Sequence, residues 1–345
     1  MIDPIGTFDD LKQDIIRYVK TAFCTRFPTI ETERAGRLGM NGMLSQEPWI
    51  EPLPNYVSSH KKINDLSVID LPNMTGNEME LFKGLVQCGL FRGDIELYQH
   101  QQEMLLNSLK GRNCVITAGT GSGKTESFLL PLFAQIAREI PKWDNPSSTH
   151  AHINDWWKDR KWKAECKQEQ KSPRVPQRGH ESRPAAVRGL ILYPMNALVE
   201  DQLTRLRKSL DSEEARKWLS INTPGNKIYL GRYNGATPVP GHELKKRTGG
   251  GWKVDQDKVE KLISALKEVE LSAEKAEDYA SDVRNNDLDK NEVRYFFPRL
   301  DGAEMRCRWD MQEFPPDILI TNFSMLSIML MGFLLQQELP LVVQD

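Results

Sequence analysis

The sequence from Asn113 to Pro131 reads N-C-V-I-T-A-G-T-G-S-G-K-T-E-S-F-L-L-P, and it decides the fold that we expect. Residues 114–117 are apolar or favour β-structure, which predicts a buried parallel strand. A glycine-rich loop follows at 118–125, and the apolar residues from Phe128 to Ile136 then predict a helix. A strand, a glycine-rich loop and a helix in this order predict a phosphate-binding loop on the rim of a parallel sheet.

The residue types in this loop suit the binding of a triphosphate. Glycines have no Cβ, so they let the backbone wrap around a phosphate and point its N–H groups inward. The positive end of the following helix adds to that attraction. Lys124 can reach the β- and γ-phosphates and Thr125 can offer its hydroxyl to Mg²⁺, so these two are the predicted catalytic residues. The alternative is an ordinary glycine-rich turn. The predicted nucleotide-binding residues of the loop are Thr120, Gly121, Ser122, Gly123, Lys124 and Thr125.

The composition is that of a globular protein with a large core. The chain has 345 residues, of which 27% are charged and 39% hydrophobic, enough for one or two domains. The formal net charge of -2 provides no overall basic field, so a nucleic-acid surface would have to be local. The five cysteines form no C-x-x-C pair, so we expect neither a disulfide framework nor a zinc site, which fits a reducing cytoplasm.

No membrane segment is expected. The first ten residues, M-I-D-P-I-G-T-F-D-D, are acidic and lack the apolar stretch of a signal peptide. Residues 318–335 are mostly apolar and have about the length of a spanning helix, which is the alternative interpretation. Because Thr321, Asn322, Ser324 and Ser327 interrupt that stretch, we interpret it as a buried strand followed by a buried helix, in a cytoplasmic protein.

A possible base-binding segment precedes the phosphate loop by about twenty residues. Residues 1–90 predict a mostly helical accessory region with no visible chemistry, and a helix is then expected from 97 to 109. An amide both donates and accepts hydrogen bonds, so Gln101 is predicted to read the edge of adenine, with Tyr98 packed beside the base. The alternative is an ordinary surface glutamine. We expect His100 to be structural or exposed and not catalytic.

Three further strands are predicted, at 189–194, 227–233 and 317–321, with helices between them. This alternation indicates an α/β fold with a doubly wound parallel sheet. Ligands of such sheets bind at the carboxyl ends of the strands, where the loops are free to touch a substrate. The loops that directly follow the three strands contain Pro194–Asn196, Asn234–Gly235 and Thr321–Asn322.

Two insertions interrupt the sheet pattern, at about 142–188 and 239–295. The first holds four tryptophans, and from Trp156 to Arg188 it has ten Lys/Arg against four Asp/Glu. Basic charge interleaved with aromatic rings could follow a nucleic-acid backbone and stack on bases. The alternative, which we favour for the individual tryptophans, is a solvated loop with its rings packed onto the domain. The second insertion predicts a charged helix at 255–279 with one solvated face.

In chain order, these motifs resemble a known family. They are Y-Q-H-Q, A-G-T-G-S-G-K-T, Y-P-M-N-A-L-V-E-D-Q, Y-N-G-A-T and P-P-D-I-L-I-T-N-F-S-M-L. Together they look like the N-terminal part of a superfamily 2 DEAD/DEAH-box helicase, over about residues 95–335. The form of the third motif is similar to large bacterial helicases of the MrfA/Lhr-like type and to the helicase subunits of anti-phage systems such as Druantia and DISARM. Ala118, where the usual pattern has glycine, is common in helicases.

The resemblance implies a RecA-like P-loop NTPase lobe that binds ATP and Mg²⁺ and grips one strand of nucleic acid, largely without reading its sequence. It implies DNA more than RNA, other subunits of a defence system as partners, and no membrane. The lobe, incomplete, would occupy 91–345 after the accessory region. The residues that match the strand-gripping motifs are Pro194, Asn196, Gln202, Gly235, Thr237, Thr321 and Asn322.

The sequence departs from the family pattern near its end. It contains no D-E-x-H or D-E-A-D stretch, and the second lobe with its arginine finger is missing. Asp345 is either the first residue of the acidic motif, and so a Mg²⁺ ligand, or a premature end. We therefore expect nucleotide binding with weak or no hydrolysis. The alternatives are a non-enzymatic remnant that binds nucleic acid or a partner subunit, and a phosphate-loop ATPase outside the helicases.

Overall fold

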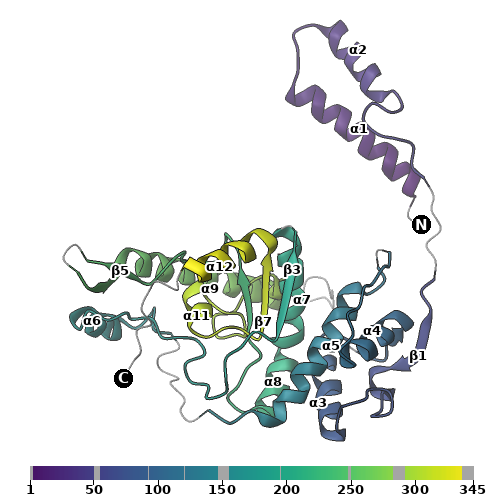
Figure 1. The fold of residues 1–345 in the computed structure, drawn as a ribbon. Coiled ribbons are helices and arrows are strands. Elements are labelled where there is room, and N and C mark those ends of the chain that lie inside the picture. Colours follow the sequence, from purple (N-terminus) through teal and green to yellow (C-terminus); the bar gives the residue numbers. More distant parts are fainter. Residues whose placement is uncertain are drawn as a thin grey trace. The chain divides into compact units, whose positions relative to one another are not determined.

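The computed structural model describes residues 3–49, 55–91, 93–119, 121–146, 155–194, 196–247, 250–282 and 292–335. The chain separates into two compact units, Met1–Asn55 and Tyr56–Asp345. Figure 1 shows the elements of each unit, and the second unit holds all the described strands and the predicted phosphate loop.

The first unit is a pair of helices. α1 (Pro4–Ala22) begins after Asp3, whose carboxylate accepts hydrogen bonds from two backbone N–H groups of the first turn at 3.1 and 3.0 Å. α2 (Pro28–Gly39) begins at a proline, whose fixed φ suits the first turn of a helix. Arg34 of α2 donates a hydrogen bond to the carbonyl of Phe23, just after α1, at 2.7 Å, and so joins the two helices.

A parallel sheet lies at the centre of the second unit (Figure 1). Its strands are β3 (Gly189–Tyr193), β4 (Leu230–Tyr233) and β7 (Ile318–Asn322), in the order β3-β7-β4. Both neighbouring pairs are parallel. Three of the predicted strands are therefore present, and the predicted α/β fold with a parallel sheet flanked by helices is confirmed.

Helices cover one face of this sheet through the main core. Ile318 and Ile320 of β7 are fully buried there, together with apolar residues of α5 (Lys124–Glu139) and α7 (Asn196–Leu210). Residues two apart on a strand face the same side, so these two isoleucines define the face that the two helices cover.

Leu319 faces the opposite side of β7 and belongs to a second apolar cluster. That cluster includes methionines of α11 (Arg308–Glu313) and α12 (Phe323–Leu335). β7 and α12 confirm a buried strand followed by a helix at residues 318–335, but the prediction that this helix is buried is wrong. Phe323, Ile328 and Leu330 are 72%, 54% and 58% exposed, because only one side of α12 packs against the second cluster. None of the described helices, α12 included, is long and apolar enough to cross a membrane.

The strand that the sequence predicts at Cys114–Thr117 is absent. Residues 112–119 form neither helix nor strand, and the side chain of Val115 is 91% exposed. An apolar run becomes a strand only when a neighbouring strand accepts and donates its backbone hydrogen bonds. Within the described residues β3 pairs only with β7, so no partner stands beside 114–117. The phosphate loop precedes a helix as predicted, but the prediction that it extends from a strand of the sheet is wrong.

An outer layer packs against α5. Both α3 (Gly76–Gln87) and α4 (Gln99–Leu109) contact it. The strands β1 (Ser58–Lys62) and β2 (Glu96–Tyr98) pair antiparallel, and β2 leads directly into α4. α3 thus shares a core with α5, and the boundary between the two compact units falls after Asn55. The predicted accessory region, residues 1–90, therefore includes elements of both units, and its separate role stays a prediction.

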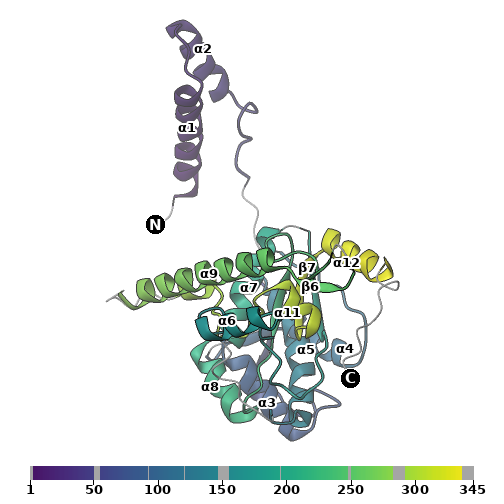
Figure 2. The same ribbon diagram turned by 90° about the vertical axis from the view of Figure 1, so that its left-hand side faces the viewer.

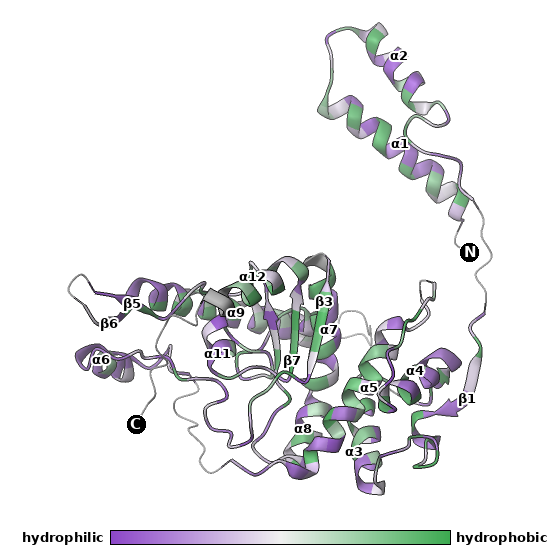
Figure 3. Ribbon diagram, viewed as in Figure 1, coloured by the Kyte–Doolittle hydropathy of each residue, from purple (hydrophilic) through white to green (hydrophobic). Residues whose placement is uncertain are grey.

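The first insertion packs two of its tryptophans inside the protein. Trp156 and Trp157 are 1% and 0% exposed, and their rings meet edge to face at 5.9 Å between centroids. The hypothesis that these two rings stack on bases is therefore wrong, because rings buried in a core cannot reach a nucleic acid. The charged helix α6 (Arg160–Gln168) follows them, and Figure 3 colours it mostly hydrophilic.

The end of this insertion is held beneath the sheet by a buried ion cluster. The guanidinium of Arg183 contacts both carboxylate oxygens of Asp317, at 2.9 and 2.8 Å. Asp317 also accepts from Arg188 at 2.7 Å and from the backbone N–H of Tyr229 at 2.7 Å. Burial opposes the charge of Arg183, but the hydrogen bonds and attraction of Asp317 outweigh it and raise its pKa. The cluster fixes the entry to β7.

The second insertion consists of a hairpin and a long helix. The hairpin strands are β5 (Leu244–Lys246) and β6 (Trp252–Val254), and the helix is α9 (Gln256–Asp282). Figure 2 shows α9 running past the other helices, and Figure 3 shows hydrophilic and hydrophobic residues alternating along it. Leu262 and Leu266 form its buried stripe, so the helix predicted at 255–279 is present with one solvated face.

Candidate nucleotide-binding site and sheet edge

The predicted phosphate loop lies between α4 and α5, which pack along each other. Thr120 lies outside the described residues. Gly121 and Gly123 have φ angles of 76° and 69°, in the left-handed region that glycine adopts at little cost. Lys124 is the first residue of α5, so the positive end of that helix faces the loop. Two left-handed glycines before a helix make the compact turn that a bound phosphate requires.

The loop is closed by bonds between its own groups. Ser122 Oγ donates to the carbonyl of Gly119 at 2.9 Å. The ammonium of Lys124 folds back and donates to the carbonyls of Ala118 and Gly119 at 2.8 and 2.5 Å. A phosphate oxygen carries more negative charge than a carbonyl oxygen, so it would compete well for this ammonium. Its bonds to the two carbonyls already place the Lys124 ammonium inside the loop, where a phosphate would bind.

Gln101, the predicted adenine-reading residue, joins α4 to the loop. Its side chain is 2% exposed. Its Oε1 accepts from the backbone N–H of Tyr98 at 2.9 Å, and its Nε2 donates to the carbonyl of Gly123 at 3.1 Å. A Cβ on Gly123 would overlap that Nε2, so only glycine fits there. These bonds leave one amide hydrogen of Gln101 for an adenine edge.

An aromatic cluster lies beside the same loop. The rings of Tyr98 and His100 stack, with centroids 5.5 Å apart and planes 15° apart. Tyr56 meets both rings, at 5.5 and 5.9 Å, and its hydroxyl would lie 2.7 Å from a Cβ placed on Gly119. The sequence analysis missed Tyr56, because nothing in a segment so far upstream signals contact with the loop. The cluster offers an apolar wall on which a base could rest.

Few side chains at the phosphate loop could coordinate a magnesium ion. Thr125 is half-buried in the first turn of α5. The neighbouring Glu126 pairs with Arg205 at 2.9 Å. Among the described residues, no three His, Cys, Asp or Glu side chains gather as a metal site. A Mg²⁺ ion would therefore be held by the Thr125 hydroxyl, waters and phosphate oxygens, which suits an ion that arrives with a nucleotide. Asp345, the other candidate ligand, lies outside the described residues.

The predicted strand-gripping motifs meet at one edge of the sheet. Tyr193 at the end of β3 is opposite Asn322, and Tyr233 at the end of β4 is opposite Thr321. The three strands therefore end level, and the loops after them lie together, as the sequence predicts. Burial, followed by repulsion from Asp201, raises the pKa of Tyr193.

Three of the predicted strand-gripping side chains point inward. Gln202 is fully buried, where its Oε1 accepts from the hydroxyl of Tyr193 at 3.1 Å. Thr237 is 5% exposed and donates to the carbonyl of Arg232 at 2.6 Å. Thr321 is fully buried and donates to the carbonyl of Tyr233 at 2.6 Å. In this conformation these three side chains shape the edge and do not line its surface.

The other predicted residues of this edge lie closer to solvent. Pro194 and Gly235 are exposed, and a Cβ on Gly235 would meet nothing within 4 Å. Asn322 Oδ1 accepts from the backbone N–H of Met325 at 2.8 Å and so supports the first turn of α12. Asn196 opens α7, and its side chain is outside what the structure describes.

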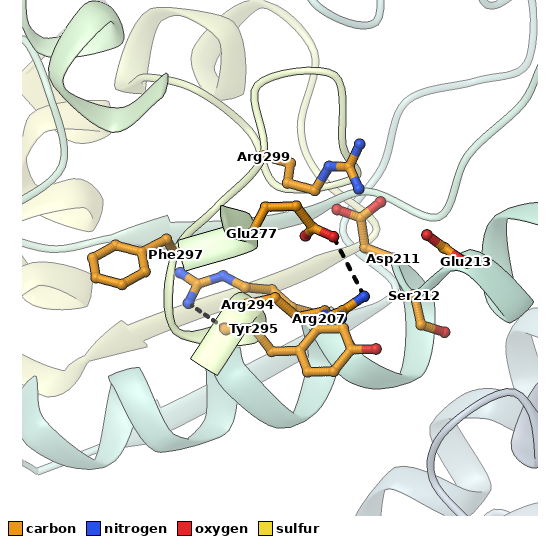
Figure 4. Close-up of a pocket in the computed structure, with 9 residues that line it drawn as sticks. All are labelled: Arg207, Asp211, Ser212, Glu213, Glu277, Arg294, Tyr295, Phe297 and Arg299. Atoms are coloured by element: carbon orange, nitrogen blue, oxygen red, sulfur yellow. Dashed lines mark hydrogen bonds and ion pairs between the residues drawn. The ribbon is translucent and has the colours of Figure 1, made fainter. Parts of the chain in front are cut away.

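A polar pocket elsewhere in the unit is a structural junction. It lies where α7 meets α8 (Glu213–Asn222), and Figure 4 shows charged side chains of both signs around it. Arg207 pairs with the buried Glu304 at 2.6 Å and donates to a backbone carbonyl of the 292–296 segment at 3.1 Å. Arg294 pairs with Glu277 of α9 at 3.5 Å. The bond from Arg207 to the carbonyl of Tyr295 attaches the end of the second insertion to α7, and both arginines are paired with carboxylates, so we assign no ligand to the pocket.

Comparison with known proteins agrees with the geometry. Residues 98–229 match the family model described as DEAD/DEAH box helicase. Over these residues the chain is similar to DEAD/DEAH box helicases. The segment begins at Tyr98 and therefore contains α4, the phosphate loop, α5, β3 and α7, whereas β4 and β7 of the sheet edge lie outside it. No solved structure gives a significant match to the chain.

The chain is also similar to the Druantia protein DruE of Escherichia coli (strain UMEA 4076-1). The two are 28% identical over 348 residues, which cover 94% of this chain and 17% of that protein. The chain thus spans less than a fifth of the length of this relative. The predicted resemblance to a helicase of the anti-phage type is confirmed.

Proposed function

We propose that this chain is the ATP-binding first lobe of an ATP-dependent helicase or translocase. The observation that supports ATP binding best is the loop itself. Its two left-handed glycines lie directly before Lys124, and the lysine ammonium already lies against the loop carbonyls. Thr120, Gly121, Ser122, Gly123 and Lys124 would hold the phosphates, and Thr125 would hold Mg²⁺.

The adenine would lie against α4. Gln101 would offer its remaining amide hydrogen to the base, and Tyr98 would pack beside it. Both side chains are already fixed, since Gln101 is buried between Tyr98 and Gly123 and Tyr98 stacks on His100. Side chains held in place before binding lose little entropy when the base arrives.

The nucleic acid would lie across the carboxyl edge of the sheet. Pro194, Asn196, Gly235 and Asn322 would contact its phosphate backbone, while the buried Gln202, Thr237 and Thr321 would shape the surface or contact the strand after a rearrangement. DNA is the proposed substrate, as the resemblance to large bacterial helicases implies. By the similarity to DruE we propose a cytoplasmic role in anti-phage defence with other subunits of such a system.

Hydrolysis by this chain is proposed to be weak. Glu126, the carboxylate next to the loop, is paired with Arg205, so it is not available to orient an attacking water. A steady-state ATPase assay of the 345-residue chain with and without single-stranded DNA measures this. We expect turnover close to background in both cases, and strong stimulation by DNA would contradict the proposal.

Nucleic-acid binding is tested by anisotropy with labelled single-stranded DNA and RNA of the same sequence, with and without ATP. Gly235→Glu adds a negative charge to the edge without a steric clash, so it should weaken binding by about fivefold at low salt. Gly76→Glu, an exposed position on α3 with equally open surroundings, is the matched control. Equal effects of both substitutions would place the strand elsewhere. DNA binding that ignores ATP and Lys124→Ala would instead support a non-enzymatic remnant.

A further inference from the structure

His100 makes a contact with the phosphate loop that its place in the sequence does not suggest. Its Nε2 lies 2.8 Å from the carbonyl oxygen of Ser122. A carbonyl oxygen can only accept, so Nε2 must carry the hydrogen. The imidazole stacks on Tyr98 and meets the edge of Tyr56, so two rings restrict its rotation. The donor is therefore held in a fixed direction.

Because a peptide bond is planar, fixing the carbonyl of Ser122 also fixes the direction of the next N–H in the loop. The carbonyl of Ser122 and the N–H of Gly123 belong to one planar trans peptide, in which they point in opposite directions. His100 holds the carbonyl on the α4 side. The N–H of Gly123 consequently points away from α4.

Gln101 does the same for the next peptide. Its Nε2 donates to the carbonyl of Gly123, so the N–H of Lys124 also points away from α4. Two consecutive side chains of α4 thus hold two consecutive carbonyls of the loop. The φ of 69° at Gly123 is what lets both carbonyls face one helix, and it favours glycine.

We propose that His100 is a positioning residue that aims the backbone N–H of Gly123 at a nucleotide phosphate; this rests on the nucleotide-binding function proposed above. Donors that are oriented before the ligand arrives need no reorganisation when it binds. His100 itself does not touch the nucleotide. Its hydrogen bond lowers the cost of ordering the loop, so its loss weakens binding of the phosphates.

The test compares two substitutions in the 345-residue chain. His100→Phe keeps a flat ring for Tyr98 and Tyr56 but removes the donor. His100→Gln places an amide N–H near the position of Nε2 and so restores it. Binding of a fluorescent ADP analogue is titrated for each protein, with Gln99→Ala, an exposed neighbour on α4, as the control. We expect His100→Phe to weaken binding about 2- to 10-fold, the loss of one hydrogen bond, and His100→Gln to recover most of it.

The outcomes separate this inference from the proposed function. If the unmodified chain does not bind the ADP analogue, or Lys124→Ala binds it equally well, the nucleotide site itself is wrong. If the unmodified chain binds and His100→Phe binds equally tightly, the site stands and the role of His100 is wrong. Equal weakening by His100→Phe and His100→Gln would also overturn it, because a donor would then not be what matters. Melting temperatures of all variants show that each is folded.

Discussion

The glycines of the phosphate loop allow a sharp prediction, because two of them share one backbone conformation and differ in their surroundings. Gly121 and Gly123 both lie at φ near 70°, in the left-handed region. A Cβ on Gly121 would meet nothing within 4 Å, whereas a Cβ on Gly123 would overlap Nε2 of Gln101. Alanine at Gly121 therefore adds backbone strain alone, and alanine at Gly123 adds strain and displaces Gln101.

The magnitudes follow from these two terms. A residue with a Cβ costs about 1–2 kcal/mol in the left-handed region, which both variants carry. Gly123→Ala also loses the hydrogen bond from Gln101 to its carbonyl, worth about 0.5–1.5 kcal/mol. We therefore expect Gly121→Ala to lower the free energy of unfolding by about 1–2 kcal/mol and Gly123→Ala by about 1.5–3.5 kcal/mol.

Urea unfolding at a fixed ADP concentration well above the dissociation constant is the assay. Without ADP, the substituted loop can change its conformation and so avoid part of the strain that the new Cβ causes. Bound ADP holds the loop in one conformation, so that strain then appears as a smaller increase in the free energy of unfolding on adding ADP. Unfolding without ADP separates the two contributions. A cost for Gly121→Ala that equals or exceeds that of Gly123→Ala would show that Gln101 does not pack on the loop as described.

Two further predictions concern the support of the sheet. Arg183→Met should lower the free energy of unfolding by about 3 kcal/mol, because it removes two charged hydrogen bonds from the buried carboxylate of Asp317 and leaves it those from Arg188 and the N–H of Tyr229. Arg299→Met, in an exposed pair, should change it by less than about 1 kcal/mol; urea denaturation checks both, and equal losses would refute the ion-cluster argument. Trp157→Ala should lower the free energy of unfolding by about 3–5 kcal/mol in the same measurement and leave the dissociation constant for single-stranded DNA unchanged. Weaker DNA binding without a loss of stability would contradict the buried position of Trp157.

The sequence predicted the parts of the fold that local patterns determine. The β3, β4 and β7 strands and the helices after β3 and β7 are where apolar periodicity places them. The level ends of these strands follow from parallel pairing alone, so the meeting of the motif loops was predictable. Left-handed glycines before Lys124 were likewise implicit in the G-S-G-K-T sequence.

The remainder depends on partners that lie far away in the sequence. Residues 114–117 look like a strand, but pairing requires a neighbour, and no described strand lies there. Gln202, Thr237 and Thr321 match motifs for contacting a nucleic acid, yet all three are buried. Gln202 bonds the hydroxyl of Tyr193, and the two threonines bond backbone carbonyls. Tyr56 reaches the loop through the β1–β2 pair, a contact that no local pattern reveals.

The central claim is that Lys124 and its loop capture a triphosphate. Isothermal titration calorimetry of the 345-residue chain with ATP and Mg²⁺ tests it, with Lys124→Ala beside the exposed control Lys142→Ala. Loss of a charged hydrogen-bond donor costs about 1.5–3 kcal/mol, so Lys124→Ala should bind roughly 10- to 150-fold more weakly, and Lys142→Ala should match the unmodified chain. ATP binding that is unaffected by Lys124→Ala, or absent from the unmodified chain, would contradict the account.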